Sequence, residues 1–344
     1  MSISFLLGAF LSILSVPFRK SILLTQLFLF YIWLLWGWNY WNGDYEAYET
    51  LYNNILFTST IEYEIGYKML MLLAKVNNLT FQEFFQIVSL CVIFLWDRFI
   101  LKVTRNPALF VAIFFWLFFP LDYVLLRNTI AFSIILQGLL ILINNKPYKA
   151  VKFSALVFIA TTIHSSSYFY FLFLLLPFLA KLSNDKILLL SFLVIIIGFL
   201  SRSIFFSFTS GNFEGRESSY NGSIVLMVIY GMWEIMTSWI LYRFKSKFVD
   251  TNHKDNPFDI LFYMSIILLA LIPIYSMVGI VVRIYRNMLM VFIAFLSNIL
   301  FQRKYSESVI LSMTFISVFL ITQFILPVLH YTIWPLFNNN IIFN

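Results

Sequence analysis

The stretch VAIFFWLFFPLDYVLLRNTIAFSIILQGLLILINNK, residues 111–146, decides the fold class. It holds two apolar runs, Val111 to Leu126 and Ile130 to Ile143, which meet at a tight turn around Arg127 and end at Lys146. A helix needs about 20 largely apolar residues to cross a bilayer, and cytoplasmic loops collect Lys and Arg. The stretch therefore predicts two membrane-spanning helices that are joined by a turn and followed by a basic junction.

The composition of the whole chain indicates the same class. Of 344 residues, 61% are apolar, 20% are aromatic and 11% are charged, whereas a soluble domain carries roughly 25% charged residues. This excludes a soluble globular protein. The net charge is +7 but no dense basic patch occurs, so we expect no nucleic-acid partner. Cys91 is the only cysteine, which excludes disulfides and cysteine-based metal sites.

Further apolar runs alternate with basic junctions and predict an all-α, polytopic integral membrane protein in a single domain, 1–344. We expect about twelve spanning helices. Their ranges are 2–17, 21–38, 82–101, 108–124, 127–144, 152–164, 166–181, 187–204, 223–243, 259–279, 284–302 and 306–327. Positive charge follows the first run instead of preceding it, which predicts a retained helix with its N-terminus outside rather than a signal peptide. Gly66 to Val76 is too short to span and is expected at the outer surface.

Three connecting segments distinguish the two sides of the membrane. Residues 39–67 carry carboxylates and tyrosines but no Lys or Arg, and predict an acidic, aromatic outer loop. Residues 205–222 predict a second outer loop, and the basic segment 244–258 predicts an inner one. Several cations then remain on the outer side, namely Lys68, Lys75, Arg127, Arg202, Arg216, Arg283 and Arg286.

Three of these outer cations are candidates for ligand binding. Arg127 lies in the turn between two spans, and Arg283 and Arg286 share one helix face at an equivalent boundary. A cation at a helix centre costs about 2.5–3.5 kcal/mol on insertion scales. Guanidinium groups bind phosphate oxygens through charge-assisted hydrogen bonds, so this set favours a lipid pyrophosphate. Alternatively, the arginines snorkel to ordinary headgroups, or pair with Glu234, Asp122 or the acidic loop.

Two further polar residues stand out. His164 opens the sequence His164-Ser165-Ser166 at an outer boundary and is a candidate proton acceptor, although packing against a neighbouring helix would explain it equally well. No second histidine lies at metal-ligand spacing, so we expect no metal site. Glu234 lies midway along an otherwise uncharged span and needs an arginine or a polar cavity, unless it serves a proton relay. The aromatic residues of the outer loop either stack on sugar rings or form an ordinary aromatic belt.

Five short motifs occur along the chain in an order that is typical of a known family. They are Asp44-Tyr45-Glu46-Ala47-Tyr48, Glu62-Tyr63-Glu64-Ile65-Gly66-Tyr67, Leu126-Arg127-Asn128-Thr129-Ile130-Ala131, Ile163-His164-Ser165-Ser166 and Arg283-Ile284-Tyr285-Arg286. The ordered set spans most of the chain and resembles the EpsG-like branch of the Wzy-type polysaccharide polymerases, which includes O-antigen polymerases. Ile65 stands where that family usually has proline, and Asn128 where it usually has glutamine.

The resemblance implies a GT-C-like helical bundle in the bacterial inner membrane with its active site facing the periplasm. Such an enzyme is a glycosyltransferase that uses no cofactor and transfers a growing glycan from undecaprenyl pyrophosphate onto a new lipid-linked repeat unit. Donor and acceptor are then both undecaprenyl-pyrophosphate-linked oligosaccharides, and a chain-length regulator is a candidate partner. The loops 39–67 and 205–222 would be periplasmic and 244–258 cytoplasmic.

The same resemblance assigns roles to the candidate residues. Arg127, Arg283 and Arg286 would stabilise the pyrophosphate, and His164, Glu64 or Glu62 would deprotonate the acceptor hydroxyl. Residues expected to hold the glycan or a lipid are Asp44, Tyr45, Tyr48, Tyr67, Lys68, Tyr285 and Glu234.

Other membrane functions remain open at the level of sequence. A lipid-linked oligosaccharide flippase would suit the number of helices, although it should carry its cations deep within the spans rather than at their outer ends. A ligase that attaches finished polymer to lipid A core also uses arginines and a histidine at the outer face. A membrane acyltransferase would be expected to show a His and Asp motif, and none is convincing here.

Overall fold

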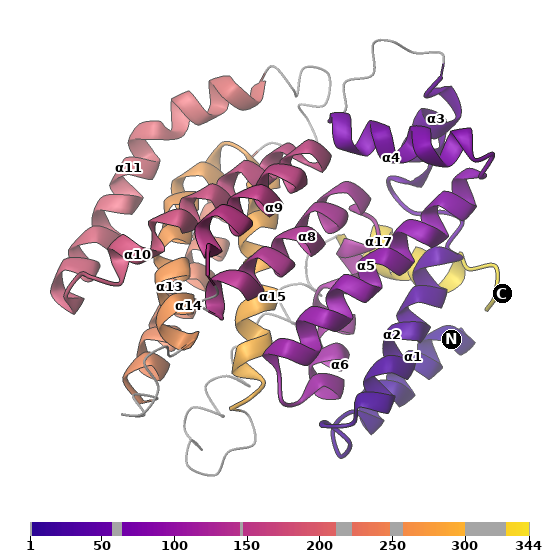
Figure 1. Ribbon diagram of the computed structural model, residues 1–344, viewed down its shortest axis with the longest axis horizontal. Coiled ribbons are helices and arrows are strands. Elements are labelled where there is room, and N and C mark those ends of the chain that lie inside the picture. The colour runs from indigo at the N-terminus through magenta and orange to yellow at the C-terminus, as the bar shows by residue number, and fades with distance from the viewer. Residues whose placement is uncertain are drawn as a thin grey trace. The chain divides into compact units, whose positions relative to one another are not determined.

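The computed structural model describes residues 2–56, 64–144, 147–210, 222–247, 257–299 and 328–343. Within these ranges the chain is helical and forms no strand, and one isolated antiparallel bridge joins Asn39 to Asn340 (Figure 1). The predictions for Glu62 and for a span at 306–327 lie outside the described residues. The all-α prediction is confirmed for the part of the chain that is described.

The helices of the first half are α1 (Ile3–Leu14), α2 (Ile22–Gly37), α3 (Tyr45–Asn54), α4 (Ile65–Val76), α5 (Phe81–Val103), α6 (Pro107–Leu117), α7 (Phe119–Asp122), α8 (Leu126–Ile143) and α9 (Lys149–Ile163). Those of the second half are η1 (Ser165–Leu175), α10 (Leu176–Leu179), α11 (Asn184–Ser210), α13 (Ile224–Lys247), α14 (Pro257–Leu268), η2 (Leu269–Ser276), η3 (Gly279–Val281), α15 (Val282–Leu296) and α17 (Val328–Asn338).

Five of the described helical stretches are long and apolar enough to cross a membrane. They are 81–103, 126–143, 224–245, 257–276 and 279–296, and shorter apolar helices accompany them. The chain is therefore a helical membrane protein, while the expected total of about twelve spans is not confirmed. One difference from the expected ranges has a clear cause: the span predicted at 259–279 changes from α14 to the 3₁₀ segment η2 around Pro273, whose ring cannot continue an α-helix.

The three predicted loops are shorter than expected. The segment 39–67 contains α3 and the first residues of α4. The helix α11 continues to Ser210, inside the predicted loop 205–222, and α13 continues to Lys247, inside 244–258. The acidic segment is partly helical because Tyr45, Tyr48 and Tyr52 recur on one face of α3, where all three are buried.

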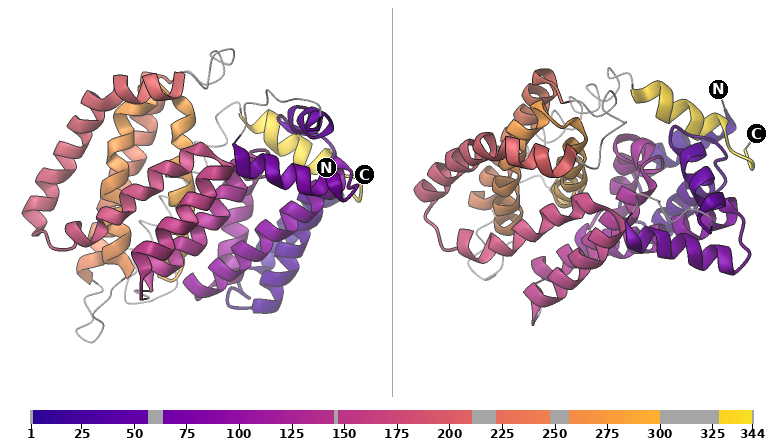
Figure 2. Two further views of the ribbon diagram at one scale, coloured as in Figure 1. Left: turned by 45° about the horizontal axis from the view of Figure 1, so that its top comes forward. Right: turned by 90° about the horizontal axis from the view of Figure 1, so that it is seen from above.

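The described chain divides into two compact units. Unit 1 comprises 1–140, 152–167 and 290–344, and unit 2 comprises 141–151 and 168–289. In unit 1 the helices α1, α2, α5 and α6 pack side by side (Figures 1 and 2). In unit 2 the segment η2 packs against both α11 and α13.

Unit 1 has two chemically different ends, because α5 runs from one to the other. At the start of α5, Thr80 and Glu83 form a capping box, and Gln82 donates to the carbonyl oxygen of Gly37 at the end of α2. At the other end, the backbone N–H of Ala108 donates to the carbonyl oxygen of Arg19 at 3.1 Å. That second end carries the basic residues Arg19, Lys20, Arg98, Lys102 and Arg105.

Candidate functional site

Glu64 occupies the N-terminal end of α4, in unit 1. Its backbone is extended (φ −61°, ψ 142°), as is usual for the residue that precedes a helix. Two residues later, Gly66 lies directly against Thr162 near the end of α9, where any Cβ atom would collide with the Thr162 backbone. Glycine at position 66 thus permits the close approach of two helix ends that brings Glu64 next to the residues following α9.

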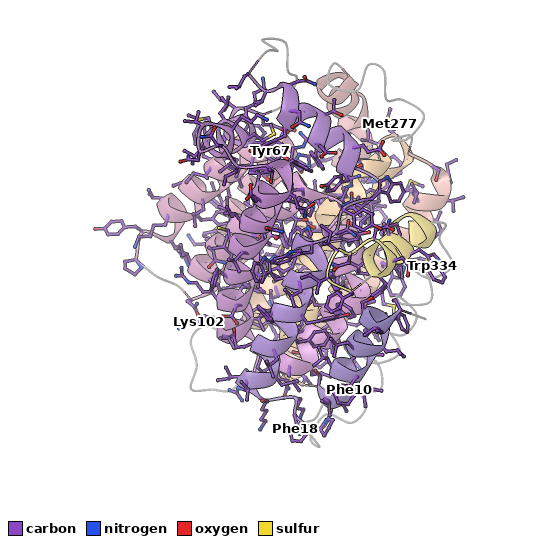
Figure 3. The ribbon with its side chains drawn as sticks, turned by 90° about the vertical axis from the view of Figure 1, so that its right-hand side faces the viewer. Phe10, Phe18, Tyr67, Lys102, Met277 and Trp334 are labelled. Atoms are coloured by element: carbon purple, nitrogen blue, oxygen red, sulfur yellow. The ribbon has the colours of Figure 1, made fainter. Side chains whose placement is uncertain are left out.

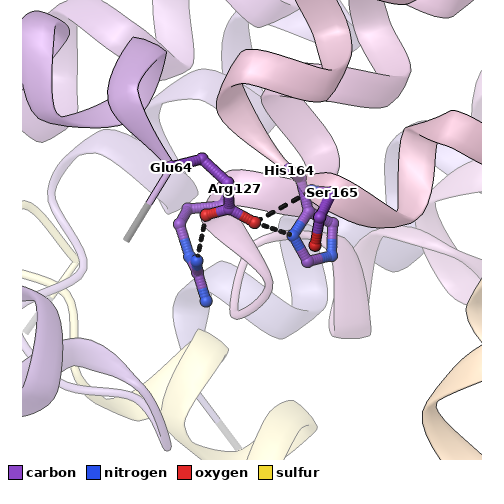
Figure 4. A network of polar contacts seen from close by, with 4 residues as sticks. All are labelled: Glu64, Arg127, His164 and Ser165. Carbon is purple, nitrogen blue, oxygen red and sulfur yellow. Dashed lines mark hydrogen bonds and ion pairs between the residues drawn. The ribbon is translucent and has the colours of Figure 1, made fainter. Parts of the chain in front are cut away.

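The Glu64 carboxylate contacts three groups from two other segments (Figure 4). Nη1 of Arg127, in the first turn of α8, donates to Oε2 at 2.6 Å. The other oxygen, Oε1, accepts the backbone N–H of Ser165 at 2.8 Å and lies 3.4 Å from Nδ1 of His164. The predicted candidates Glu64, Arg127 and His164 are therefore adjacent in space, and we call these three residues the Glu64 cluster.

The Glu64 cluster is largely shielded from solvent. The side chains of Glu64, Arg127 and His164 are 19%, 17% and 13% exposed. Burial by itself would raise the pKa of the Glu64 carboxyl. The contact with His164, the positive charge of Arg127 and the backbone N–H groups of Ser165 and Glu64 outweigh that effect, and hold the pKa well below its usual range. Glu64 is consequently an ionised carboxylate and a weak base at neutral pH.

This arrangement separates the chemical roles of the three side chains. A carboxylate that accepts a charged hydrogen bond and a backbone N–H is suited to orienting its neighbours rather than to removing a proton. Because Nδ1 of His164 faces the carboxylate, a proton on Nδ1 is favoured, and Nε2 is then left as an acceptor. Of the three predicted bases, His164 is the one whose surroundings in the structure suit that role, while Glu62 lies outside the described residues.

The other predicted phosphate ligands belong to unit 2. Arg283 is partly exposed and Arg286 is buried, at 2% exposure, in the first turns of α15. Between them, the hydroxyl of Tyr285 shares a hydrogen bond of 2.8 Å with Thr237 of α13. A joint pyrophosphate site of Arg127, Arg283 and Arg286 stays a prediction.

Glu234 is buried midway along α13, also in unit 2. Its exposure is 1%, and its Oε1 accepts a hydrogen bond from the Tyr275 hydroxyl of η2. The rings of Tyr230 and Tyr285 lie nearby, since the Tyr230 ring centroid is 6.1 Å from that of Tyr275 and 6.5 Å from that of Tyr285. The partner of Glu234 is thus a tyrosine, which the sequence had not indicated.

Three tyrosines that were expected to contact the glycan are buried in the structure. Tyr45 is buried against Phe81, with its hydroxyl donating to Gln82 at 2.7 Å, and the pKa of Tyr45 is raised to about 12 chiefly by burial. Tyr48 and the fully buried Tyr67 pack edge to face, with their ring centroids 5.9 Å apart. The expected contact of Tyr45, Tyr48 and Tyr67 with a glycan stays a prediction. Of the remaining expected residues, Asp44 and Lys68 are partly exposed and Tyr285 is buried.

Two elements of the site were missed in the sequence. Ser165 is the first residue of η1, and its backbone N–H is one of the donors that a helix start leaves without a partner inside the helix. The sequence His164-Ser165-Ser166 does not by itself show that a helix starts there. The contact between Gly66 and Thr162 joins positions that are distant in the chain, and no local pattern reveals it.

Comparison with known proteins gives one result. The model of the EpsG family matches residues 21–338, which include the whole Glu64 cluster. That family comprises Wzy-like polymerases and related membrane glycosyltransferases. Comparison with the curated proteins and with the solved structures finds no match.

Proposed function

Since the chain belongs to the EpsG family, we propose that it is a polysaccharide polymerase that acts on lipid-linked glycans. In this proposal it transfers a growing glycan from undecaprenyl pyrophosphate onto a new lipid-linked repeat unit, as O-antigen polymerases do. The proposal includes a GT-C-like bundle of about twelve spanning helices, of which the described stretches supply five.

The observation that carries the proposal is the Glu64 cluster. One ionised carboxylate contacts both a guanidinium group and an imidazole, at 2.6 Å and 3.4 Å. A polymerase of this kind needs a positive charge for the departing pyrophosphate and a base for the attacking hydroxyl. Arg127 and His164 supply the two, and Glu64 orients them.

The reaction is a substitution at the anomeric carbon of the donor. A hydroxyl oxygen of the acceptor sugar attacks that carbon, and the bond from the carbon to the pyrophosphate oxygen breaks. The hydroxyl proton passes to Nε2 of His164, and undecaprenyl pyrophosphate leaves with the bonding electron pair. Arg127 stabilises the charge of the leaving group, and Arg283 and Arg286 are the further cations proposed for it. A pyrophosphate leaves readily, so the step needs no strong general acid.

Unit 1 offers support for an active site on the periplasmic face of the bacterial inner membrane. The Glu64 cluster lies toward the end at which α5 begins, because α4 leads into α5 and Tyr67 packs on Phe84. Arg98, Lys102 and Arg105 lie at the opposite end. Since cytoplasmic segments collect Lys and Arg, the Glu64 cluster would face the periplasm.

A gene deletion distinguishes this proposal from its competitors. In a strain whose surface polysaccharide is attached to lipid A core, we expect the deletion to leave a single repeat unit on the core. Free polymer that is not attached to the core would indicate a ligase, and complete loss of surface repeats would indicate a flippase. Either of those patterns would contradict the proposal.

Complementation then tests the site. Plasmid-borne His164→Ala should not restore polymer, whereas the wild-type gene should, with equal amounts of both proteins in the membrane fraction. A base of this kind contributes about 10²–10⁴-fold to a rate, and such a loss would be visible as missing ladder bands. Normal ladders from His164→Ala would show that the proposed base is wrong.

A further inference from the structure

Asparagine side chains form hydrogen bonds between the C-terminal segment and the end of α2. Four asparagines, Asn39, Asn42, Asn339 and Asn340, form what we call the asparagine joint, in unit 1. The Asn39 amide donates to the carbonyl oxygens of Pro335 and Asn339 at 2.9 and 3.0 Å. The Asn340 amide donates to those of Leu34 and Leu35 at 2.9 and 3.0 Å. Asn39 and Asn340 are completely buried, so the joint is rigid.

The rigid joint carries aromatic side chains that are exposed. Tyr40 and Trp41 are 46% and 38% exposed, and Trp334, just before the Pro335 that Asn39 contacts, is 59% exposed (Figure 3). The indole N–H of Trp41 donates to Oε1 of Glu46 at 3.1 Å, and this bond favours one orientation of the ring. The backbone on both sides is also held, because Tyr40 N donates to the carbonyl oxygen of Asn339 at 3.0 Å.

Such a surface has the chemistry of a sugar-binding site. Sugar rings present C–H groups that pack against the electron-rich faces of aromatic rings. Neighbouring carboxylates and amides accept and donate hydrogen bonds to sugar hydroxyls, which fixes the orientation of the ligand. A ring that is already held in place loses little conformational entropy on binding.

We propose that Tyr40, Trp41 and Trp334, together with Glu46, form a glycan-binding platform that holds the polysaccharide chain outside the reaction centre. This inference rests on the proposed polymerase function and extends it to the substrate beyond the reacting sugar. The aromatic residues of the segment 39–67 were already candidates for stacking on sugar rings, and the platform adds Trp334 of α17 to Tyr40 and Trp41.

The surroundings of the platform favour a glycan over the membrane surface. An aromatic belt consists of rings at the ends of spanning helices, with their polar edges toward lipid headgroups. Trp41 lies instead between α2 and α3, and its polar edge is bonded to Glu46. The segment 39–56 carries Asp44, Glu46 and Glu49 and no Lys or Arg, so it would repel anionic headgroups.

The platform and the Glu64 cluster both belong to unit 1, where hydrogen bonds tie α17 and α2 to Tyr123. The Tyr123 hydroxyl donates to the carbonyl oxygen of Thr332 in α17 at 2.6 Å. The carbonyl oxygen of Tyr123 accepts the indole N–H of Trp36, in α2, at 3.1 Å. Tyr123 lies four residues before Arg127, in the turn between α7 and α8. A glycan held on the platform would therefore be bound to the same part of unit 1 that carries the Glu64 cluster.

A binding measurement tests the platform directly. The full chain is placed in nanodiscs of phosphatidylcholine, and the probe is the surface polysaccharide of the producing strain, released from its lipid by mild acid and sized to defined repeat numbers. We expect Trp41→Ala to weaken binding of this probe about two- to tenfold, which is the range for one aromatic contact. Trp41→Phe retains a ring and should bind nearly as the wild type does.

The control is Trp239→Ala, which removes a tryptophan that is 49% exposed on α13 of unit 2 and should leave glycan affinity unchanged. Glu46→Gln retains an acceptor for the indole N–H and so should fold, even if Trp41→Ala does not. In cells, Trp41→Ala should shorten the most abundant polymer length on a gel without abolishing polymerisation.

The outcomes separate the platform from the polymerase proposal. Wild-type affinity for the probe in both Trp41→Ala and Trp334→Ala would overturn the platform, whatever His164→Ala does. Unchanged glycan affinity of these variants, together with a lower Tm in phosphatidylglycerol nanodiscs, would assign the rings to contacts with lipid and also overturn it. Normal ladders from His164→Ala would contradict the proposed catalytic role of His164. The binding measurement alone would then decide whether the platform exists.

Discussion

Gly66 lies so close to Thr162 that a Cβ atom at position 66 would come within 2.7 Å of the Thr162 carbonyl oxygen. Glu64 precedes Gly66 by two residues, and His164 follows Thr162 by two residues. The contact between the two helix ends therefore sets the distance between the carboxylate and the imidazole. The geometry of the Glu64 cluster therefore depends on a residue that has no side chain.

The first prediction concerns this contact. We expect Gly66→Ala to push α4 away from α9 and to lower stability by about 1–3 kcal/mol, the usual cost of overpacking. Polymer synthesis should fall together with the stability of the protein. The measurements are the Tm of the purified protein and the polysaccharide ladder of complemented cells. The matched control is Gly43→Ala, whose Cβ atom would meet Val124 only at 4.0 Å, an ordinary contact. Equal Tm values and ladders for the two variants would contradict the role assigned to Gly66.

The second prediction concerns the pH dependence of stability. The folded-state pKa of Glu64 is lowered from its ordinary value of 4.5, so the ionised carboxylate stabilises the folded state. That contribution is fully present above about pH 4.5 and is lost progressively as the pH falls toward the folded-state pKa. We expect Glu64→Gln to reduce the Tm at neutral pH and to approach the wild type as the solution is acidified below about pH 4.5.

A thermal-shift series across this range measures the effect, with Glu49→Gln as the control. Glu49 is a partly exposed carboxylate on α3 in the same unit. A difference between wild type and Glu64→Gln that is independent of pH would show that Glu64 does not act through its charge.

The third prediction concerns the pairing of Arg127 with Glu64. Because the two side chains form one charged hydrogen bond at 2.6 Å, their substitutions should not be additive. We expect the double variant Arg127→Ala with Glu64→Gln to be more stable than the sum of the single effects predicts, by about 0.5–3 kcal/mol. A double-mutant cycle of unfolding free energies in detergent gives the coupling, and additive effects would mean that the pair is not formed in solution.

Substitutions of Arg127 should show whether polymer synthesis needs only the positive charge of this residue or also its planar guanidinium group. Lysine retains the positive charge but not the planar group that can donate two parallel hydrogen bonds to phosphate oxygens. We therefore expect Arg127→Lys to support fewer and shorter polymers than the wild type, while Arg127→Ala supports none. The ladder of each strain measures this, at matched protein abundance.

The general architecture could be read from composition and charge, whereas contacts between distant segments could not. The apolar runs identified a helical membrane protein, and the family motifs identified Glu64, Arg127 and His164 separately. Their adjacency depends on Gly66 and Thr162, which are nearly a hundred positions apart. Side-chain direction was the weakest inference: Tyr45, Tyr48 and Tyr52 lie on one buried face of α3, whereas the sequence was interpreted as an acidic, aromatic outer loop.

The last prediction concerns Glu234 in unit 2. Its Oε1 accepts the Tyr275 hydroxyl, whereas Oε2 has no hydrogen-bond partner within the described part of the chain. Removing the tyrosine hydroxyl would leave a fully buried carboxyl group without that bond, which typically costs about 1–3 kcal/mol. We therefore expect Tyr275→Phe to lower the unfolding free energy by this amount. Tyr242→Phe should have little effect, because Tyr242 is an exposed residue of α13 whose ring packs against Phe262. If the two variants were equally stable, the bond between Tyr275 and Glu234 would not hold η2 to α13, and the buried carboxyl would have to be satisfied by another group.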